Sequence, residues 1–107
     1  MKSINIGKDF SDTPWGRYPD DGPVSGERFR EEMLRPALKE DRKVSVSIDD
    51  AEGYGSSFLD EAFGGLVRKG YYTAKQLNDF LTIECQDPDY MIYRDLIWKY
   101  INEAKPE

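Results

Sequence analysis

Hydrophobic and polar residues alternate in three short segments, and this alternation is typical of half-buried β-strands. The segments are residues 2–6, 43–49 and 81–85. The middle segment places Val44, Val46 and Ile48 on one face and two small serines on the other. Small residues on the second face favour a central strand that helices cover on both sides.

Apolar residues at helical spacing fill the intervals between these strands. The first helix is predicted to begin after Ser25, whose hydroxyl suits an N-cap, and to bury one face from Phe29 to Leu38. Pro36 lies inside this run. Because proline has no backbone N–H and crowds the preceding turn, it predicts a kink or an early end near Leu34.

A second helix, from about Ser57 to Arg68, has the apolar pattern of an element buried on most of its surface. Gly64 and Gly65 lie inside it, where glycine costs about 1 kcal/mol relative to alanine. We therefore expect these glycines to permit close approach of the helix backbone to the sheet or to a neighbouring helix.

Two shorter signals complete the pattern. Thr73 and Gln76 fit a capping box that opens a short helix, and Asp87 followed by Pro88 opens the last helix. The order is strand, helix, strand, helix, short helix, strand, helix. Such alternation predicts an α/β fold with a central, mostly parallel or mixed sheet covered by helices. The length of 107 residues allows one domain, so we expect a single domain over residues 1–107.

Residues 7–24 form a long connection with three prolines, which exclude a long helix. Its aromatic residues are Phe10, Trp15 and Tyr18. They either pack down as a lid on the core or contribute to a binding site. We expect a well-ordered loop folded over the strand ends, with Arg17 held by a carboxylate or by a bound anion.

The composition argues against several classes of chemistry. The chain has no histidine, which is the commonest general base and metal ligand, and its single cysteine excludes an internal disulfide or a Cys-only zinc site. A net charge of −6 without a basic arm argues against nonspecific nucleic-acid binding. No apolar run approaches the roughly 18 residues of a transmembrane helix. We expect a cytoplasmic protein that is not an enzyme, uses no cofactor and does not contact a membrane.

The candidate chemistry lies at two helix starts. The turn at residues 53–57 has the position of a phosphate-binding loop but lacks the lysine of a P-loop. The acidic residues Asp49, Asp50 and Glu52 precede it; such residues after a strand are typical turn formers, and we expect no metal site. A candidate anion site lies at the start of the first helix. Its members would be Arg17, Ser25, Arg28 and Arg30.

Several blocks of sequence are shared with known families. They are Gly16-Arg17-Tyr18, Asp21-Gly22-Pro23, Ser25-Gly26-Glu27, Phe29-Arg30 and the long block from Gly53 to Leu66. Over nearly the whole chain these blocks resemble the bacterial STAS-like family of unknown function. The strand at residues 44–49 followed by Ser56-Ser57-Phe58-Leu59 is also similar to the STAS domain of anti-sigma-factor antagonists, in which a partner kinase phosphorylates one serine. The resemblance implies a STAS-like fold.

By position, the resemblance implies that Ser57 stands where the regulatory serine of the antagonists stands, with Ser56 just before it. Gly55 replaces the aspartate of the antagonist motif. The acidic pair Asp60 and Glu61 would repel a phosphate on Ser57. The residues alone favour another interpretation: Ser57 and Asp60 fit a capping box, so that the serine is a structural helix cap.

The leading hypothesis is a non-enzymatic protein–protein interaction module of bacterial signalling. Its partner surface is expected at Tyr54, Gly55, Asp60 and Glu61, in the turn and the helix start. The resemblance implies partner switching with a histidine-kinase-like ATPase, because kinases of that class are the partners of the antagonists.

Two other functions compete with this hypothesis. The first is a small anion- or nucleotide-binding domain that uses the three arginines of the candidate anion site. The second is a carboxylate-based enzyme that uses Asp21, Asp49 and Asp60. The enzyme has the weakest support, because no spacing in the sequence brings these carboxylates together.

Overall fold

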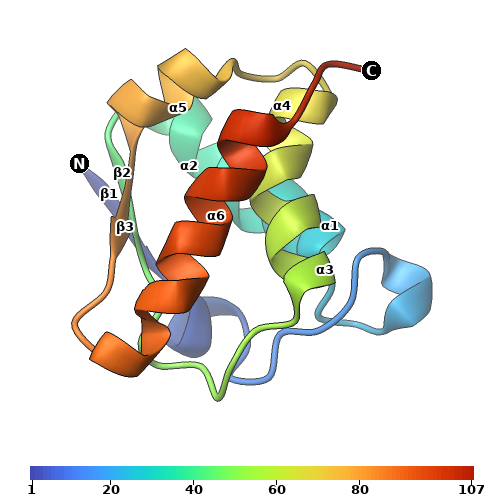
Figure 1. Cartoon of the computed structure of the whole chain (residues 1–107), viewed down its shortest axis with the longest axis vertical. Coiled ribbons are helices and arrows are strands. Elements are labelled where there is room, and N and C mark those ends of the chain that lie inside the picture. The colour runs from blue at the N-terminus through green and yellow to red at the C-terminus, as the bar shows by residue number, and fades with distance from the viewer.

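Three parallel strands form one sheet. The computed structural model describes residues 1–107, and its strands are β1 (Lys2–Asn5), β2 (Val44–Ser47) and β3 (Leu81–Glu84). β2 is the central strand, as predicted, and pairs in parallel with both neighbours. The α/β class is therefore confirmed, and the sheet is wholly parallel (Figure 1).

The first helix continues past Pro36, where the sequence predicted a kink or an early end. It has three continuous pieces, which are α1 (Gly26–Phe29), a π-helical turn (Arg30–Leu34) and α2 (Arg35–Glu40). The Ser25 hydroxyl accepts a hydrogen bond from the backbone N–H of Arg28, which confirms the N-cap. The predicted early end near Leu34 is wrong. The wider π-helical turn just before Pro36 accommodates the proline ring, so the helix continues.

The second helix is also interrupted by a π-helical turn. Its pieces are α3 (Ser56–Leu59), the turn Asp60–Gly64 and α4 (Gly65–Arg68). A β-carbon on Gly64 would lie 3.4 Å from the backbone oxygen of Tyr100 in the last helix. A β-carbon on Gly65 would overlap the guanidinium of Arg30 in the first helix. The close approach predicted from the glycine pair is confirmed at Gly65. The Gly64 β-carbon would be in ordinary contact with Tyr100 and would crowd Asp60 and Arg68 of its own helix.

The last two helices begin where their caps predict. Gln76 donates its backbone N–H to the Thr73 hydroxyl (3.1 Å), and Thr73 donates its N–H to the Gln76 side-chain oxygen (2.9 Å). This reciprocal capping box opens α5 (Ala74–Phe80). The Asp87 side chain caps the short turn Pro88–Tyr90, which leads into α6 (Met91–Glu103).

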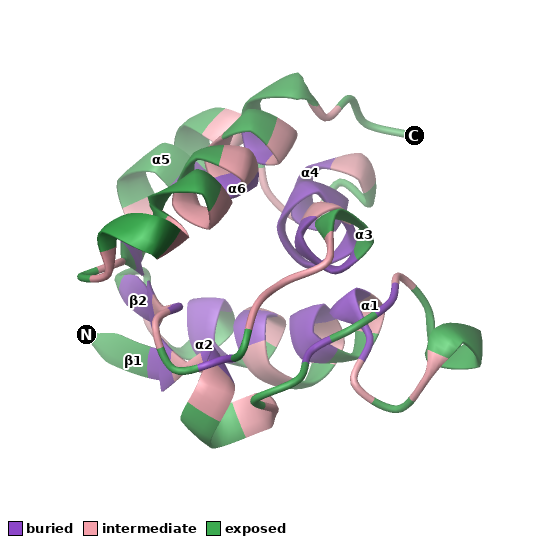
Figure 2. Ribbon diagram, turned by 60° about the horizontal axis from the view of Figure 1, so that its bottom comes forward, coloured by how far each residue is buried: buried purple, intermediate pink, exposed green.

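All helices lie on one side of the sheet, so the fold has two layers (Figure 1). Buried residues are concentrated where the helices face one another and the sheet (Figure 2). The prediction that helices cover both faces of β2 is wrong. Ser45 is buried because the neighbouring strands crowd it, and its hydroxyl donates to the Glu84 carboxylate at 3.3 Å. The small side chain of Ser45 therefore suits the limited space between the neighbouring strands.

The segment at residues 7–24 is tied down along its length. Its first part lies beside the strand ends, where Glu52 donates its N–H to the Asp12 carbonyl at 2.7 Å. Phe10 packs edge-on against Phe29 of the core. Of the two alternatives for the aromatic residues, a lid on the core does not hold for Trp15 and Tyr18, which are 65% and 48% exposed.

Candidate functional site

Aromatic side chains pack against the turn between β2 and α3 and hold it in place. The Tyr54 hydroxyl donates to the Ile48 carbonyl at 2.7 Å, and the Tyr54 ring packs against those of Phe58 and Tyr93. Burial, followed by neighbouring tyrosines and carboxylates, raises the pKa of Tyr54 well above its usual value, so the hydroxyl remains a donor. Tyr54 thus supports the turn, and only part of its side chain is exposed.

The acidic residues after β2 hold the turn to its neighbour strand. The Asp49 carboxylate accepts backbone N–H groups of Gln86 (2.7 Å) and Asp87 (3.2 Å), just beyond β3. Asp50 accepts a hydrogen bond from the Asn5 side chain at 2.6 Å. No group of three or more His, Cys, Asp or Glu side chains is arranged to hold a metal ion.

Ser56 and Ser57 are both exposed at the start of the second helix. The prediction that Ser57 caps this helix is wrong, because the helix begins at Ser56 and Gly55 occupies the N-cap. Glycine is an accepted residue there, and no side chain completes the cap. Asp60, the other half of the expected capping box, binds arginines. Neither serine hydroxyl is therefore used to start the helix.

An open pocket of about 260 Å³ lies over this helix start. Its lining consists of Trp15, Gly16, Arg17, Asp21, Gly55, Ser56 and Ser57. The Trp15 ring lies over Gly55, where a β-carbon would be 3.4 Å from the ring. The exposed aromatic loop and the two serines thus belong to one surface, which we call the serine-turn surface and define by these lining residues together with Tyr18.

Arginines engage both acidic residues that follow the serines. Asp60 accepts hydrogen bonds from Arg17 (2.8 Å) and from Arg68 (2.9 Å). Burial alone would raise the pKa of Asp60, but these hydrogen bonds outweigh it and the pKa is lowered. Because both arginines balance its charge, Asp60 opposes a phosphate on Ser57 less than the sequence implies. Arg17 is held by carboxylates, as predicted.

Glu61 lies beneath the surface and cannot contact a partner. It is 2% exposed, and its Oε2 accepts a hydrogen bond from Arg30 Nη1 at 2.6 Å. The same guanidinium nitrogen donates to the Glu61 backbone carbonyl at 2.8 Å. Among the four residues expected to form the partner surface, Gly55 and Asp60 remain partly accessible, Tyr54 is a support, and the expectation for Glu61 is wrong.

The predicted anion site does not form, because its members point in different directions. Arg30 is 1% exposed and holds Glu61 and Glu31. Arg28 is exposed and bonds the Glu32 carboxylate at 2.9 Å. Residues two apart on a helix face different sides, which explains the divergence. Ser25 is fully buried as a cap, so only Arg17 borders an open pocket.

Sequence reasoning missed Arg68, which binds Asp60 from the far end of the same helix. Arg68 donates to the Asp60 carboxylate and, at 3.1 Å, to the Asp60 carbonyl. The two residues are eight positions apart, or about two turns of the same helix face. Side chains that pair along a helix are ordinarily three or four positions apart, so no signal in the sequence indicated this pair.

Residues 25–90 match the family described as a STAS-like domain of unknown function (DUF4325). The match includes both interrupted helices, the serine turn and β2 and β3. No curated protein and no solved structure matches the chain. None of its helices has the length and apolar character needed to span a membrane.

Proposed function

Because the chain belongs to the family of STAS-like domains of unknown function, we propose that it is a non-enzymatic protein-interaction module of bacterial signalling whose contact area is the serine-turn surface. The observation that carries the proposal is the state of Ser56 and Ser57. Both are exposed at the start of a long helix, and no side-chain hydrogen bond caps that helix. A structural role as caps, the main competing interpretation, is therefore removed.

The rest of the serine-turn surface suits protein contact. Trp15 and Tyr18 are exposed on a loop that backbone hydrogen bonds fix to the first helix, including Gly26 N–H to the Gly16 carbonyl at 2.9 Å. Aromatic residues on a fixed backbone contribute strongly to protein interfaces, because their large area is buried at little cost in conformational entropy. The aromatic pair would supply affinity and the serines would supply regulation.

The proposed partner is an ATP-binding kinase of the histidine-kinase-like class, which would phosphorylate Ser57 or Ser56. A phosphate at a helix N-terminus is favoured by the helix dipole. Arg17 borders the same pocket, although its N–H groups are shared with Asp60. Phosphorylation would leave the start of the helix folded and would add negative charge to the contact area, so the partner would dissociate.

The test combines phosphorylation with binding. The purified chain is incubated with such a kinase, ATP and Mg²⁺, and phosphate is located by mass spectrometry. Ser57→Asp is expected to weaken kinase binding at least about tenfold, which corresponds to 1.4 kcal/mol. Ser57→Ala is expected to change the free energy of unfolding by less than about 0.5 kcal/mol, because no cap is lost.

Ser3→Asp is the matched control, since Ser3 is exposed on the polar face of the sheet. It should leave kinase binding unchanged. Phosphate on neither Ser56 nor Ser57, together with full binding by a folded Ser57→Asp variant, would refute the switch. Loss of binding in Trp15→Ala with normal folding would still assign the contact area to this surface.

A further inference from the structure

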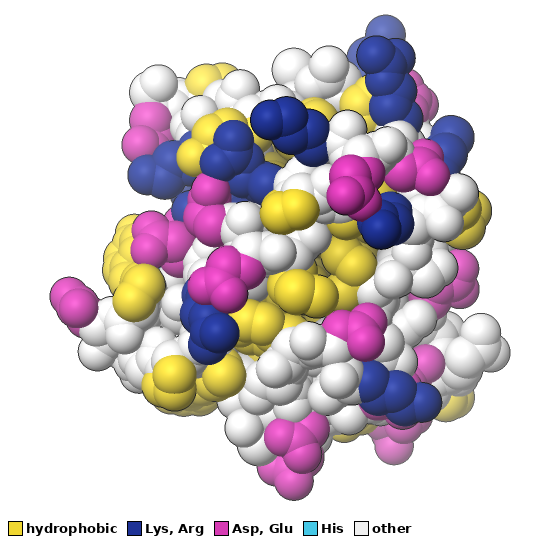
Figure 3. Space-filling view, turned by 180° about the vertical axis from the view of Figure 1, so that it is seen from behind, with side chains coloured by type: hydrophobic (Ala, Val, Ile, Leu, Met, Phe, Trp, Pro, Cys, Tyr) yellow, Lys and Arg dark blue, Asp and Glu magenta, His cyan; other side chains and the backbone are white.

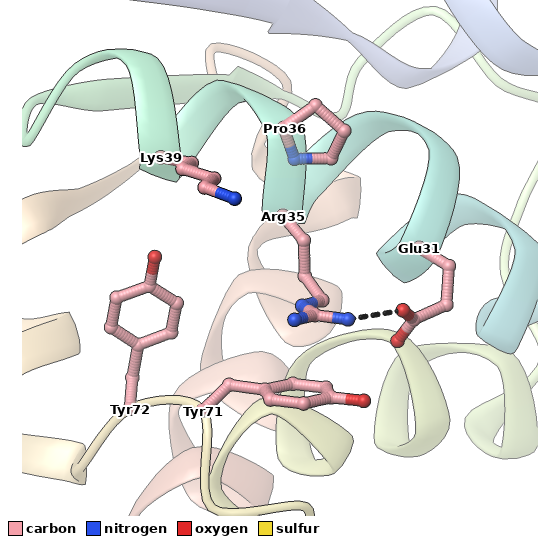
Figure 4. A pocket seen from close by; sticks show the side chains of 6 residues that line it. All are labelled: Glu31, Arg35, Pro36, Lys39, Tyr71 and Tyr72. Atoms are coloured by element: carbon pink, nitrogen blue, oxygen red, sulfur yellow. Dashed lines mark hydrogen bonds and ion pairs between the residues drawn. The ribbon is translucent and has the colours of Figure 1, made fainter.

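A second and larger cavity lies between α2 and the residues that follow α4. Its volume is about 530 Å³, within the range of small-molecule sites. Its lining consists of Glu31, Arg35, Pro36, Lys39, Tyr71 and Tyr72 (Figure 4). It shares no residue with the serine-turn surface. α2 lies on the side that Figure 3 shows, where lysine and arginine side chains gather in the upper half of the face.

Arg35 is held in one position by two different contacts. The carbon of its guanidinium lies 3.5 Å from the centre of the Tyr71 ring, which is a close cation–π stack. One of its nitrogens, Nη1, donates to Glu31 Oε1 at 2.6 Å. No protein acceptor is bound to Nε or Nη2. Arg35 therefore offers unused N–H donors from a fixed plane, which is the arrangement that binds carboxylate or phosphate oxygens.

The cavity carries an excess of positive charge although it contains Glu31. The second oxygen of Glu31, Oε2, accepts a hydrogen bond from Arg30 Nε at 2.8 Å, and Arg30 lies buried behind the cavity. Two arginines thus share the charge of Glu31. Lys39 is exposed at the edge of the cavity and forms no ion pair within the chain. The unbalanced charge favours an anion here, on a protein whose net charge is −6.

Tyr72 supplies an aromatic wall whose position is also fixed. Its ring packs edge-on against Phe80 of α5, with ring centres 6.3 Å apart. Figure 4 shows the Tyr72 hydroxyl pointing toward Lys39, while the Tyr71 ring lies under Arg35. Since Tyr71 is already covered by the guanidinium, Tyr72 is the aromatic side chain available to an incoming ring.

We propose that this cavity binds a small organic anion, a phosphate or carboxylate carried on a flat ring, with the anion at Arg35 and Lys39 and the ring against Tyr72. The volume and the two kinds of lining fit a molecule about the size of a nucleoside monophosphate. Inorganic phosphate would use only the cationic half. An uncharged nucleoside would use only the aromatic half.

The experiment titrates the ¹⁵N-labelled protein with adenosine monophosphate, phenyl phosphate, inorganic phosphate and adenosine, and follows amide shifts by NMR. Adenosine monophosphate is expected to shift the amides around Tyr71 and Tyr72 in a saturable way, more tightly than either half alone. Lys39→Gln and Arg35→Gln are each expected to weaken binding at least about tenfold. Arg35→Lys retains the positive charge but loses the planar guanidinium group with its several N–H donors, and this variant should bind with intermediate affinity.

Tyr72→Leu separates the two halves of the site, since it should weaken the two ring-bearing anions and leave inorganic phosphate unchanged. Arg28→Gln is the matched control on the same helix and should bind normally. Adenosine binding as tightly as its monophosphate would overturn the anion assignment, and so would normal binding by a folded Lys39→Gln variant. Absence of saturable shifts with every anion would overturn the site. Ser57→Asp should leave this binding intact, so the result is independent of the proposed function.

Discussion

The buried ion pair between Arg30 and Glu61 allows a quantitative test of how the two long helices are joined. Their side chains are 2% and 3% exposed, and the guanidinium makes two hydrogen bonds to Glu61. Glu61→Leu leaves the Arg30 charge in the interior with Glu31, the more distant Glu27 (3.9 Å) and the backbone carbonyl of residue 61 as its remaining partners. Breaking one partner of a buried pair typically costs 3–5 kcal/mol. Because Glu31 stays bound, we expect about 3 kcal/mol, the lower end of that range.

The assay is urea unfolding of Glu61→Leu, Arg30→Met and the double variant. With a slope of about 1–3 kcal/mol per molar urea, a loss of about 3 kcal/mol lowers the midpoint by at least about 1 M. In the double variant, apolar groups of similar size replace the buried pair, and Arg17 and Arg68, which also contact Glu61, are partly exposed and keep Asp60. Its stability should therefore lie within about 1 kcal/mol of the parent chain. The single costs are therefore expected not to add.

Lys2→Gln is the control, because Lys2 forms an exposed pair with Glu40 and its loss should cost less than about 0.5 kcal/mol. A Glu61→Leu cost below about 1 kcal/mol would mean that Arg30 is hydrated in solution. A double variant whose cost equals the sum of the single costs would show that the two residues act independently. Either result would refute the reasoning.

Two further predictions concern the same region. Gly65→Ala should destabilise the chain by about 1–3 kcal/mol in thermal unfolding, because the new β-carbon would overlap the buried guanidinium of Arg30. Gly64→Ala should cost less, because its β-carbon would crowd the paired side chains of Asp60 and Arg68, which are partly exposed and have more room to shift. The pKa of Asp60 is lowered in the folded chain, since hydrogen bonds from Arg17 and Arg68 outweigh burial. Its contribution to stability is therefore complete above the unfolded pKa of about 4 and is lost as the pH falls through the folded pKa. Urea midpoints from pH 7 to pH 3 should show this loss, and Asp60→Asn should reduce it.

Periodicity predicted the elements because burial acts on side chains at fixed intervals. The alternation in β2 follows from one face meeting the core, and the apolar spacing of the second helix follows from burial of most of its surface. The Gly64-Gly65 pair predicted close packing for a similar reason, since glycine inside a helix needs a compensating contact. These predictions use local rules, and the structure confirms them.

The candidate site was harder to predict because it depends on single-residue boundaries and on contacts between distant segments. The N-cap of the second helix is Gly55, two residues before Ser57, and this shift alone changes the serine from a cap to a free hydroxyl. The buried partner of Arg30, Glu61, lies on another helix, and the position of Arg30 two residues after Arg28 in the sequence says nothing about its burial. The π-helical turn before Pro36 has no sequence signature that would distinguish it from a helix end.

The two proposed sites are joined by one chain of charged side chains, and this restricts how each can be tested. Arg17 binds Asp60 and Glu61, Glu61 binds Arg30, and Arg30 binds Glu31, which in turn holds Arg35. The central pair is buried, so a change there would loosen the helix contact that positions both ends. Loss of function in such a variant would therefore not distinguish a binding residue from a structural one. Ser57 and Lys39 take no part in this series of ion pairs, and both side chains are exposed and unpaired. A substitution at either position therefore changes one site without disturbing the other.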